Sequence, residues 1–293
     1  MKDIPSVSIV MNCFNGETYL KQAIDSVIKQ TYEDWELIFW DNLSTDNSSV
    51  IVKSYQDHRI KYFKSEKHTL LGEARNLAMN NAKADWVAFL DVDDIWLENK
   101  LERQIELIRS DKNDIGFLYG RCEVIYSDDS KRNHNFKEGQ ILPSGNIFDE
   151  LLLENFIPFV SAVANKKKFC SLGGFDNELR HSTDYYMFLR LAEKYPVDVI
   201  QDVCCSYRIH DENLTNSLRI EGELESISIV SSFLPNPSAK KAIAYHNAGL
   251  AIAYLKEGQL IKCIQVSLRK ETLSKFFTRA INAVKKRCSS KRT

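Results

Sequence analysis

The sequence lacks a run of apolar residues approaching the roughly 20 that a bilayer-spanning helix needs. It also lacks an internal repeat and a low-complexity segment. Its formal net charge is −1 over 293 residues, which gives no indication of a nucleic-acid partner. Hydrophobic residues make up 44% and charged residues 27%, as in globular proteins. The length predicts one large domain, or a domain with an appendage.

Cysteine is present without an obvious pairing pattern. The seven cysteines include no CxxC pair and their number is odd, so we expect neither a disulfide framework nor a structural zinc site. The first 15 residues do not resemble a signal peptide. We therefore expect a reducing, cytoplasmic location.

The first half of the chain alternates strand and helix patterns. Short apolar or aromatic runs predict strands at Val7–Met11, Trp35–Trp40, Arg59–Phe63 and Trp86–Leu90. Helices are predicted between and after them, at Glu17–Lys29, Thr45–Tyr55, Gly72–Ala82 and Leu97–Arg109. This alternation predicts an α/β fold: a mostly parallel sheet with helices on both faces, which binds ligands beyond the carboxyl ends of its strands.

The second half is less regular. It predicts strands at Gly116–Ile125, Phe159–Ala164 and Asp202–Ile209, helices at Asn146–Asn155 and Thr183–Tyr195, and a polar loop or hairpin tip at Ser127–Gly139. From Leu218 the pattern is helical, with a break at Pro235–Pro237. We expect a catalytic domain over residues 1–217, with a nucleotide half to about 115 and an acceptor half from about 116, followed by a helical extension over 218–293.

The stretch AFLDVDDIWL places three carboxylates, Asp91, Asp93 and Asp94, directly after an apolar strand. Residues two apart at a strand end face the same side, so Asp91 and Asp93 would face one ligand while Asp94 points away. Carboxylate oxygens suit Mg²⁺ or Mn²⁺. The alternative is a polar strand end in which Asp94 caps the next helix.

Two further sites follow predicted strands. Asp41 could accept from a pyrimidine N–H or a ribose hydroxyl, or serve in capping, which Ser44 and Asp46 suit. Arg75 could pair with phosphate or base. Its alternative is an ion pair with Glu73 or Asp91.

Two residues of the second half are also candidates. Asp184 could cap its helix or accept a hydroxyl proton during group transfer. His210 stands before a polar loop, where it could serve as a ligand or remain structural.

In this order, the chain contains SIVMNCFNG, QTYEDWELIFWDNLSTD, GEARNLAMNNA, WVAFLDVDDIWL, LGGFDNELRHSTDYYMFLRLA and YRIHDENLT. Together these segments resemble the family 2 glycosyltransferases with the GT-A fold, over residues 5–216. The resemblance implies that Asp41 recognises the base, usually uracil, that Asp91 lies near the ribose or sugar, and that Arg75 contacts the nucleotide.

The same resemblance assigns the chemistry. It implies that Asp93 coordinates the metal bridging the diphosphate, that Asp184 is the general base, and that His210 supplies a further metal or diphosphate contact. The turn after the first strand, with Asn12, Phe14 and Asn15, should line the same sheet edge and bind nucleotide.

The sequence departs from the family pattern at two places. Asn42 and Leu43 stand where a second Asp and a Gly are common, which weakens the case for uracil over thymine or guanine. The QxxRW motif of processive synthases is absent. We therefore predict a metal-dependent inverting enzyme that adds one sugar, with a UDP-sugar donor and a glycan or lipid-linked acceptor in bacterial surface polysaccharide synthesis.

Two other functions compete with this prediction. A non-catalytic nucleotide-sugar binding module would lack the base, but Asp184 is present. A DxD-type phosphatase would place its aspartates after the first strand and follow them with a small residue and Thr or Val, whereas here DIWL continues after the fourth strand.

The C-terminal tail is strongly basic. From Lys262 onward the chain has one acid, Glu271, among many lysines and arginines. Apolar residues at helical spacing within Ser267–Lys286 suggest either a helix lying on an anionic membrane, at the inner face of the cell membrane, or a helix packed on the protein.

Overall fold

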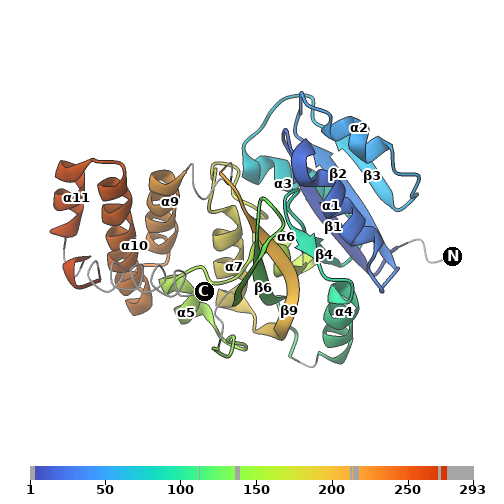
Figure 1. Ribbon diagram of the computed structural model, residues 1–293. Coiled ribbons are helices and arrows are strands. Elements are labelled where there is room, and N and C mark those ends of the chain that lie inside the picture. The colour runs from blue at the N-terminus through green and yellow to red at the C-terminus, as the bar shows by residue number, and fades with distance from the viewer. Residues whose placement is uncertain are drawn as a thin grey trace. The chain divides into compact units, whose positions relative to one another are not determined.

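The computed structural model describes residues 4–111, 113–135, 139–211, 213, 218–269 and 272–275, with no side chains for 131–135. The chain forms two compact units (Figure 1). The first contains residues Met1–Ile147 and Phe156–Asp211, and the second Phe148–Asn155 and Glu212–Thr293. The predicted boundary at 217 remains a prediction.

The first unit is built on one mixed sheet. Its strands in chain order are β1 (Val7–Cys13), β2 (Trp35–Asp41), β3 (Ile60–Lys64), β4 (Trp86–Phe89), β5 (Ile95–Trp96), β6 (Phe117–Tyr126), β7 (Lys131–Asn135), β8 (Val163–Asn165) and β9 (Val197–Ile209). Across the sheet the order is β3-β2-β1-β4-β8-β6-β9-β5, and β7 pairs with β6. The strands β1–β4 are parallel, as are β6 and β9, while β8 is antiparallel to both of its neighbours.

Helices pack on the sheet. They are α1 (Glu17–Ile28), α2 (Ser48–Lys53), α3 (Leu71–Asn81), α4 (Lys100–Ser110), α6 (Lys166–Ser171) and α7 (Thr183–Lys194), with a 3₁₀ turn η1 (Phe159–Ser161). Helix α1 buries Leu20, Ala23, Ile24 and Val27, a helical spacing, against alternate residues of β1. Helix α3 packs on β1 and β2. The α/β prediction is therefore confirmed.

The second unit is helical in the residues described. It comprises α5 (Phe148–Leu153), α9 (Arg219–Ser231), α10 (Pro237–Lys256) and α11 (Leu260–Ser267). Asn236 caps α10, its side chain accepting from the backbone N–H groups of Ser238 and Ala239, with Pro237 at the first helical position. This explains why the predicted break at Pro235–Pro237 begins a helix. Among the described helices, none combines the length and apolarity that crossing a membrane requires.

Several local predictions need correction. Phe159–Ser161 is a 3₁₀ turn rather than strand, and the strand begins only at Val163. The second helix covers Ser48–Lys53, because Ser44 and Asp46 are engaged by the neighbouring loop and do not start a helix at Thr45. Tertiary hydrogen bonds displaced both boundaries.

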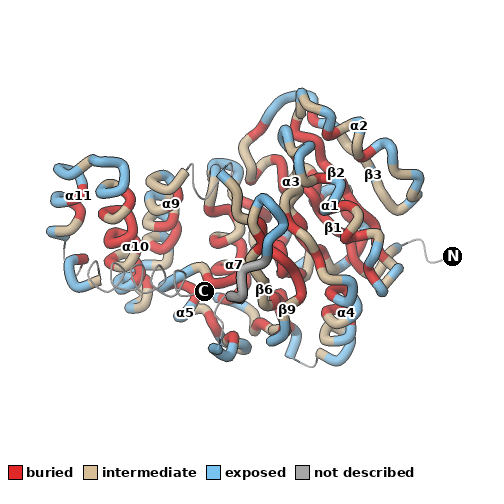
Figure 2. Tube along the Cα trace, in the orientation of Figure 1, coloured by how far each residue is buried: buried red, intermediate tan, exposed pale blue. Residues whose placement is uncertain are grey.

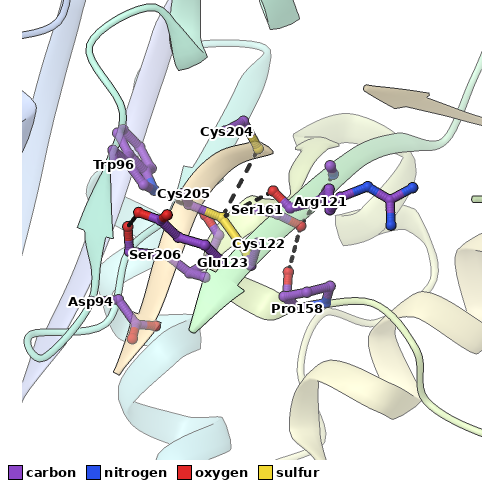
Figure 3. The surroundings of a disulfide bond; sticks show 12 residues. Asp94, Trp96, Arg121, Cys122, Glu123, Pro158, Ser161, Cys204, Cys205 and Ser206 are labelled. Carbon is purple, nitrogen blue, oxygen red and sulfur yellow. Dashed lines mark hydrogen bonds between the residues drawn. A yellow bond between two sulfur atoms is a disulfide. The ribbon is translucent and has the colours of Figure 1, made fainter. Parts of the chain in front are cut away.

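The sequence predicted no disulfide framework, yet the described residues contain one disulfide. Cys122 of β6 and Cys205 of β9 are bonded, with their Cα atoms 4.9 Å apart (Figure 3). They are separated by 83 residues, but the parallel register of the two strands places them opposite each other. Cys204, beside Cys205, remains a buried thiol. Sequence spacing cannot show a pair that only strand register creates.

Candidate active site

Two loops at the carboxyl edge of the sheet bind each other. In the loop after β1, the backbone N–H of Asn15 donates to Ser44 Oγ over 3.0 Å, and Asn15 Oδ1 accepts from the backbone N–H of Thr45 over 2.8 Å. Asp46 accepts from the N–H of Glu17, the first residue of α1, over 2.9 Å. Asn15 itself has a left-handed backbone with φ 54°. These hydrogen bonds join the loops after β1 and β2 into one surface over Asn15–Glu17 and Ser44–Asp46, which we call the ledge.

Asp41 lies beneath this ledge and is fully buried. Its Oδ1 accepts from the backbone N–H of Ser44 over 2.7 Å, and its Oδ2 accepts from the Tyr62 hydroxyl over 2.6 Å. The neighbouring Asn42 is also buried and binds Thr69 through both ends of its amide. Both side chains are buried, and their hydrogen bonds hold the loops in place.

Two other predicted nucleotide residues do offer contacts. The ring of Phe14 is half-exposed and lies 4.1 Å, centroid to centroid, from that of His68. Nδ2 of Asn12 is buried and has no hydrogen-bond partner among the described residues. A buried donor without an acceptor is costly, so it marks a position where a ligand oxygen would be favourable.

Arg75 joins three parts of the site. Its guanidinium donates to the Thr183 hydroxyl at the start of α7, and Nη2 lies 3.4 Å from Oδ1 of Asp91. The group stacks 3.9 Å above the ring of Phe159 and is almost fully buried. The ion pair with Asp91, given above as the alternative to a nucleotide contact, is present, whereas Glu73 pairs with Lys67 instead. Arg75 thus ties the DVDD stretch to the residue that precedes Asp184.

The three aspartates differ in environment. Burial, with repulsion from Asp93 and Asp184, raises the pKa of Asp91, and the charge of Arg75 opposes that rise. The Asp91 side chain is still 38% exposed, so water offsets part of this effect. The charge of Asp184 also contributes to this rise in the pKa of Asp91, so the two carboxylates lie within electrostatic range of each other.

Asp93 and His210 meet at the same site. Oδ2 of Asp93 lies 2.9 Å from Nε2 of His210, which directly follows β9. Among the described residues, no group of three or more His, Cys, Asp or Glu side chains is arranged to hold a metal. One carboxylate and one imidazole nevertheless fit a Mg²⁺ or Mn²⁺ site, because these ions keep several waters and complete their shell with substrate phosphates.

The third aspartate is part of the fold rather than of the ligand site. Asp94 is buried, and its Oδ1 accepts from the backbone N–H of Arg208 over 2.8 Å. Burial and the charges of Asp93 and Asp91 raise its pKa well above the usual range. The alternative in which Asp94 caps the next helix is wrong, because α4 begins at Lys100 with Asn99 as its cap.

Arg208 was not predicted as a site residue, although it lies in the YRIH segment two residues before His210. Its side chain is fully buried. Nε donates to the backbone carbonyl of Asp93 over 2.8 Å, and Nη1 pairs with Asp129 over 2.6 Å. The guanidinium also donates to Gln22 and lies 4.3 Å over the ring of Tyr19. The signal in the sequence is the position of this arginine between two apolar residues of a predicted strand, which could have indicated a buried cation.

The family model described as "Glycosyl transferase family 2" matches residues 8–168. The chain belongs to glycosyl transferase family 2. It is a glycosyltransferase with a GT-A fold, homologous to enzymes that use nucleotide sugars.

One curated relative is the UDP-Glc:alpha-D-GlcNAc-diphosphoundecaprenol beta-1,3-glucosyltransferase WfgD of Escherichia coli. It is 32% identical over 237 residues, which are 80% of this chain and 88% of the relative. The putative teichuronic acid biosynthesis glycosyltransferase TuaG of Bacillus subtilis is 37% identical over 106 residues, covering 36% of this chain and 42% of TuaG.

Two solved structures share the fold. S. aureus TarS 1-349 in complex with UDP-GlcNAc has a TM-score of 0.65 at 16% identity, covering 93% of this chain and 79% of that one. The mannosyltransferase PcManGT of Pyrobaculum calidifontis, in complex with GDP-Man and Mn²⁺, has a TM-score of 0.64 at 16% identity, covering 97% and 81%. At this identity the likeness shows the fold alone.

Proposed function

We propose that this glycosyltransferase moves one sugar from a UDP-sugar to a hydroxyl of a lipid-linked glycan, with inversion at the anomeric carbon and with Mn²⁺ or Mg²⁺ as cofactor. The observation that carries the proposal is the convergence of Asp91, Asp93 with His210, and Arg75 at one sheet edge, with Arg75 bonded to the residue before Asp184. The relative WfgD, by its name, uses UDP-Glc and a diphosphoundecaprenol-linked GlcNAc.

The donor would occupy the ledge and the DVDD loop. We assign the base to the half-exposed ring of Phe14 and the free amide donor of Asn12. Asn15 shapes this ledge. Asp41, which is buried and bonded to Ser44 and Tyr62, supports the base site from beneath rather than touching the base in this conformation. Asp91 would face the ribose or the sugar.

The diphosphate would lie over Asp93 and His210. Held by these two side chains, a divalent cation supplies Lewis acidity that stabilises the charge on the departing diphosphate. Through its contacts with Asp91 and with the start of α7, Arg75 holds these two parts of the chain in fixed positions beside the donor. A cation held by Asp93 and His210 would position the diphosphate beside Asp91 and near the start of α7.

Asp184 is the proposed general base. It lies in the first turn of α7, and Ser182 rather than Asp184 occupies the N-cap position. Its carboxylate takes the proton of the acceptor hydroxyl as that oxygen forms a bond to the anomeric carbon. The bond from this carbon to the diphosphate breaks with its electron pair, and attack from the opposite face inverts the centre.

A donor screen tests the proposal. Release of the nucleoside diphosphate is measured across UDP-, GDP- and dTDP-sugars, with Mn²⁺, Mg²⁺ or a chelator, and with a GlcNAc-diphosphate lipid as acceptor. We expect acceptor-dependent release from a UDP-sugar that the chelator abolishes, and a β-linked product from an α-linked donor. Donor binding without turnover would instead identify a binding module, and release of inorganic phosphate a phosphatase.

The acceptor and location extend this proposal. We expect the enzyme to act at the cytoplasmic face of the cell membrane, where a lipid-linked acceptor is accessible. The predicted contact of the basic tail with anionic lipid falls mostly on residues 276–286, outside the described part of the chain. It therefore remains a proposal.

A further inference from the structure

Tyr19, in the first turn of α1, lies against two side chains at the end of β9. Its ring centroid is 5.3 Å from that of His210, and the two ring planes are tilted by 45°. The Arg208 guanidinium lies 4.3 Å from the centre of the same tyrosine ring. These distances are typical of aromatic pairs and of cation–π contacts. Tyr19 therefore packs on Arg208 and His210 together.

Asp93 contacts the same two residues. Nε2 of His210 lies 2.9 Å from Oδ2 of Asp93, and Nε of Arg208 donates to the Asp93 backbone carbonyl over 2.8 Å. The imidazole of His210 thus meets a carboxylate at Nε2 and an aromatic ring beside it. An imidazole rotates about two side-chain bonds, and a histidine that binds a metal needs neighbouring groups to set its direction. Tyr19 is placed to be such a neighbour.

Helix α1 gives Tyr19 a fixed position. Buried residues recur among exposed ones along this helix, so one side of it is held in the core (Figure 2). Its first residue, Glu17, is bonded to the loop after β2: the Glu17 N–H donates to Asp46 over 2.9 Å, and its carboxylate accepts from the backbone N–H of Asn47 over 2.8 Å. The turn of helix that carries Tyr19 is therefore joined to the ledge.

The start of α1 also touches the other parts of the proposed metal site. A Cβ atom on Gly16 would lie 2.7 Å from Cγ2 of Val92, so the absence of a side chain lets the chain before α1 approach the DVDD stretch closely. One turn after Tyr19, Gln22 accepts from Arg208 and donates to Asp129 over 3.2 Å. All of these residues belong to the first unit. Helix α1 is thus packed on the segments that carry Asp93 and His210.

We propose that Tyr19 is a positioning residue for the metal site. Its ring holds the His210 imidazole in the direction in which Nε2 faces the Asp93 carboxylate, so that both would bind one cation. The inference rests on the proposed function, which assigns the cation to these two side chains. Because the contact is made by the ring, phenylalanine should serve as well as tyrosine. An aliphatic side chain should let the imidazole turn away from Asp93.

Calorimetry with UDP, in the presence and absence of Mn²⁺, tests this role. Tyr19→Leu should lower the affinity for Mn²⁺ measured with UDP by about tenfold, since groups that orient metal ligands are typically worth 10- to 100-fold. UDP binding without Mn²⁺ should change little. Tyr19→Phe keeps the ring and should behave like the unchanged protein. Tyr19→Met, with an unbranched side chain, repeats the test if the leucine variant does not fold.

The variant His210→Ala shows whether Tyr19 acts through the imidazole. This change should itself lower the affinity for Mn²⁺. Adding Tyr19→Leu to it should cause no further loss, because two residues that act through one contact are not additive. A full additional loss in the double variant would mean that Tyr19 acts by another route, and it would overturn the inference.

The matched control is Tyr55→Leu. Tyr55 is another half-buried tyrosine that contacts α1, and its hydroxyl donates to Asp25 over 2.7 Å. This variant should lose stability in thermal unfolding without losing affinity for Mn²⁺. Equal Mn²⁺ affinities for Tyr19→Leu and Tyr55→Leu would show that Tyr19 serves only the fold. A Tyr19→Phe variant as weak as Tyr19→Leu would show that the ring is not what matters.

The unchanged protein separates this inference from the proposed function. If Mn²⁺ does not strengthen its UDP binding, the metal site of the proposed function is wrong and the role of Tyr19 falls with it. If Mn²⁺ strengthens UDP binding equally in the unchanged protein and in Tyr19→Leu, only the inference is overturned. A Mn²⁺ effect that Tyr19→Leu weakens, in a protein that transfers no sugar, would support the inference and refute the proposed reaction.

Discussion

Nε of Arg208 donates to the backbone carbonyl of Asp93 over 2.8 Å, so β9 holds the loop that carries the proposed metal ligand. The backbone N–H of Arg208 also donates to Asp94, the next residue of that loop. Two residues further along, His210 reaches the Asp93 carboxylate itself. Arg208 is therefore a positioning residue: it fixes the distance between the two side chains that would share the cation.

We expect loss of this support to weaken metal-dependent nucleotide binding. Asp129→Asn removes the half-exposed partner of the Arg208 guanidinium while leaving the buried side chain in place. It should lower the affinity for Mn²⁺ in the presence of UDP by about 10-fold, since groups that orient ligands are typically worth 10- to 100-fold. Calorimetry measures this. Arg208→Lys replaces the planar guanidinium by a single amine, which cannot make the same set of hydrogen bonds. It should lower the Mn²⁺ affinity further and also reduce stability.

The matched control is Asp202→Asn. Asp202 pairs with Arg103 at the same 2.6 Å distance as Asp129 with Arg208, but on the exposed surface. It should leave Mn²⁺ affinity unchanged. If Asp129→Asn and Asp202→Asn behave alike, Arg208 serves only the fold.

Asp93→Asn should remove most of the metal dependence of UDP binding, because a neutral amide is a poorer partner for a divalent cation than a carboxylate. We expect Mn²⁺ to strengthen UDP binding in the unchanged protein and to have little effect in the variant. Asp85→Asn, an exposed aspartate paired with Lys167 just before β4, is the control and should behave like the unchanged protein. A variant that retains the full Mn²⁺ effect would remove Asp93 from the metal site.

Asp184→Asn should slow transfer by roughly 10²- to 10⁴-fold, the usual contribution of general acid–base catalysis. Donor affinity should change little, because the asparagine keeps the size of the side chain at the start of α7. Initial rates with a true acceptor and calorimetry with the UDP-sugar measure the two effects separately. Turnover close to that of the unchanged enzyme would place the base elsewhere.

Lys100 should give the free energy of unfolding a pH dependence. Its side chain is fully buried, its amine donates to Gln104 over 2.6 Å and lies 3.9 Å from the ring centre of Trp96. Burial lowers the pKa of Lys100 to about 7. Between this pKa and the ordinary value near 10.4, the unfolded chain binds the proton that the folded chain has released, so folding becomes more favourable as pH rises.

Within that window the titration of Lys100 raises the free energy of unfolding by up to about 1.4 kcal/mol per pH unit. Below the window it adds no pH dependence. Urea unfolding of the unchanged protein and of Lys100→Met between pH 7.5 and 9.5 measures it as a difference in slope. This comparison removes the titration of tyrosines and thiols common to both proteins. Parallel curves would show that Lys100 remains charged in the folded state.

The sequence by itself determined the first four strands and the site at their carboxyl ends. The short run Trp35–Asp41 is apolar along almost its whole length, as is typical of a strand inside a parallel sheet, and helical spacing in Glu17–Ile28 predicts a helix that covers the sheet. Asp91 and Asp93 follow directly after β4, so the sequence places both at this edge of the sheet, although they lie in the turn after the strand rather than within it.

Only the tertiary structure decided which polar side chains the neighbouring loops enclose and which ones hold the DVDD stretch in place. Asp41 is a conspicuous residue in the sequence, but Ser44 and Tyr62 enclose it. Arg208 and Asp93 are 115 residues apart, and Cys122 and Cys205 are 83 apart. These contacts depend on the register and order of strands that are distant in the chain, whereas sequence periodicity reports only which face of a single element is apolar.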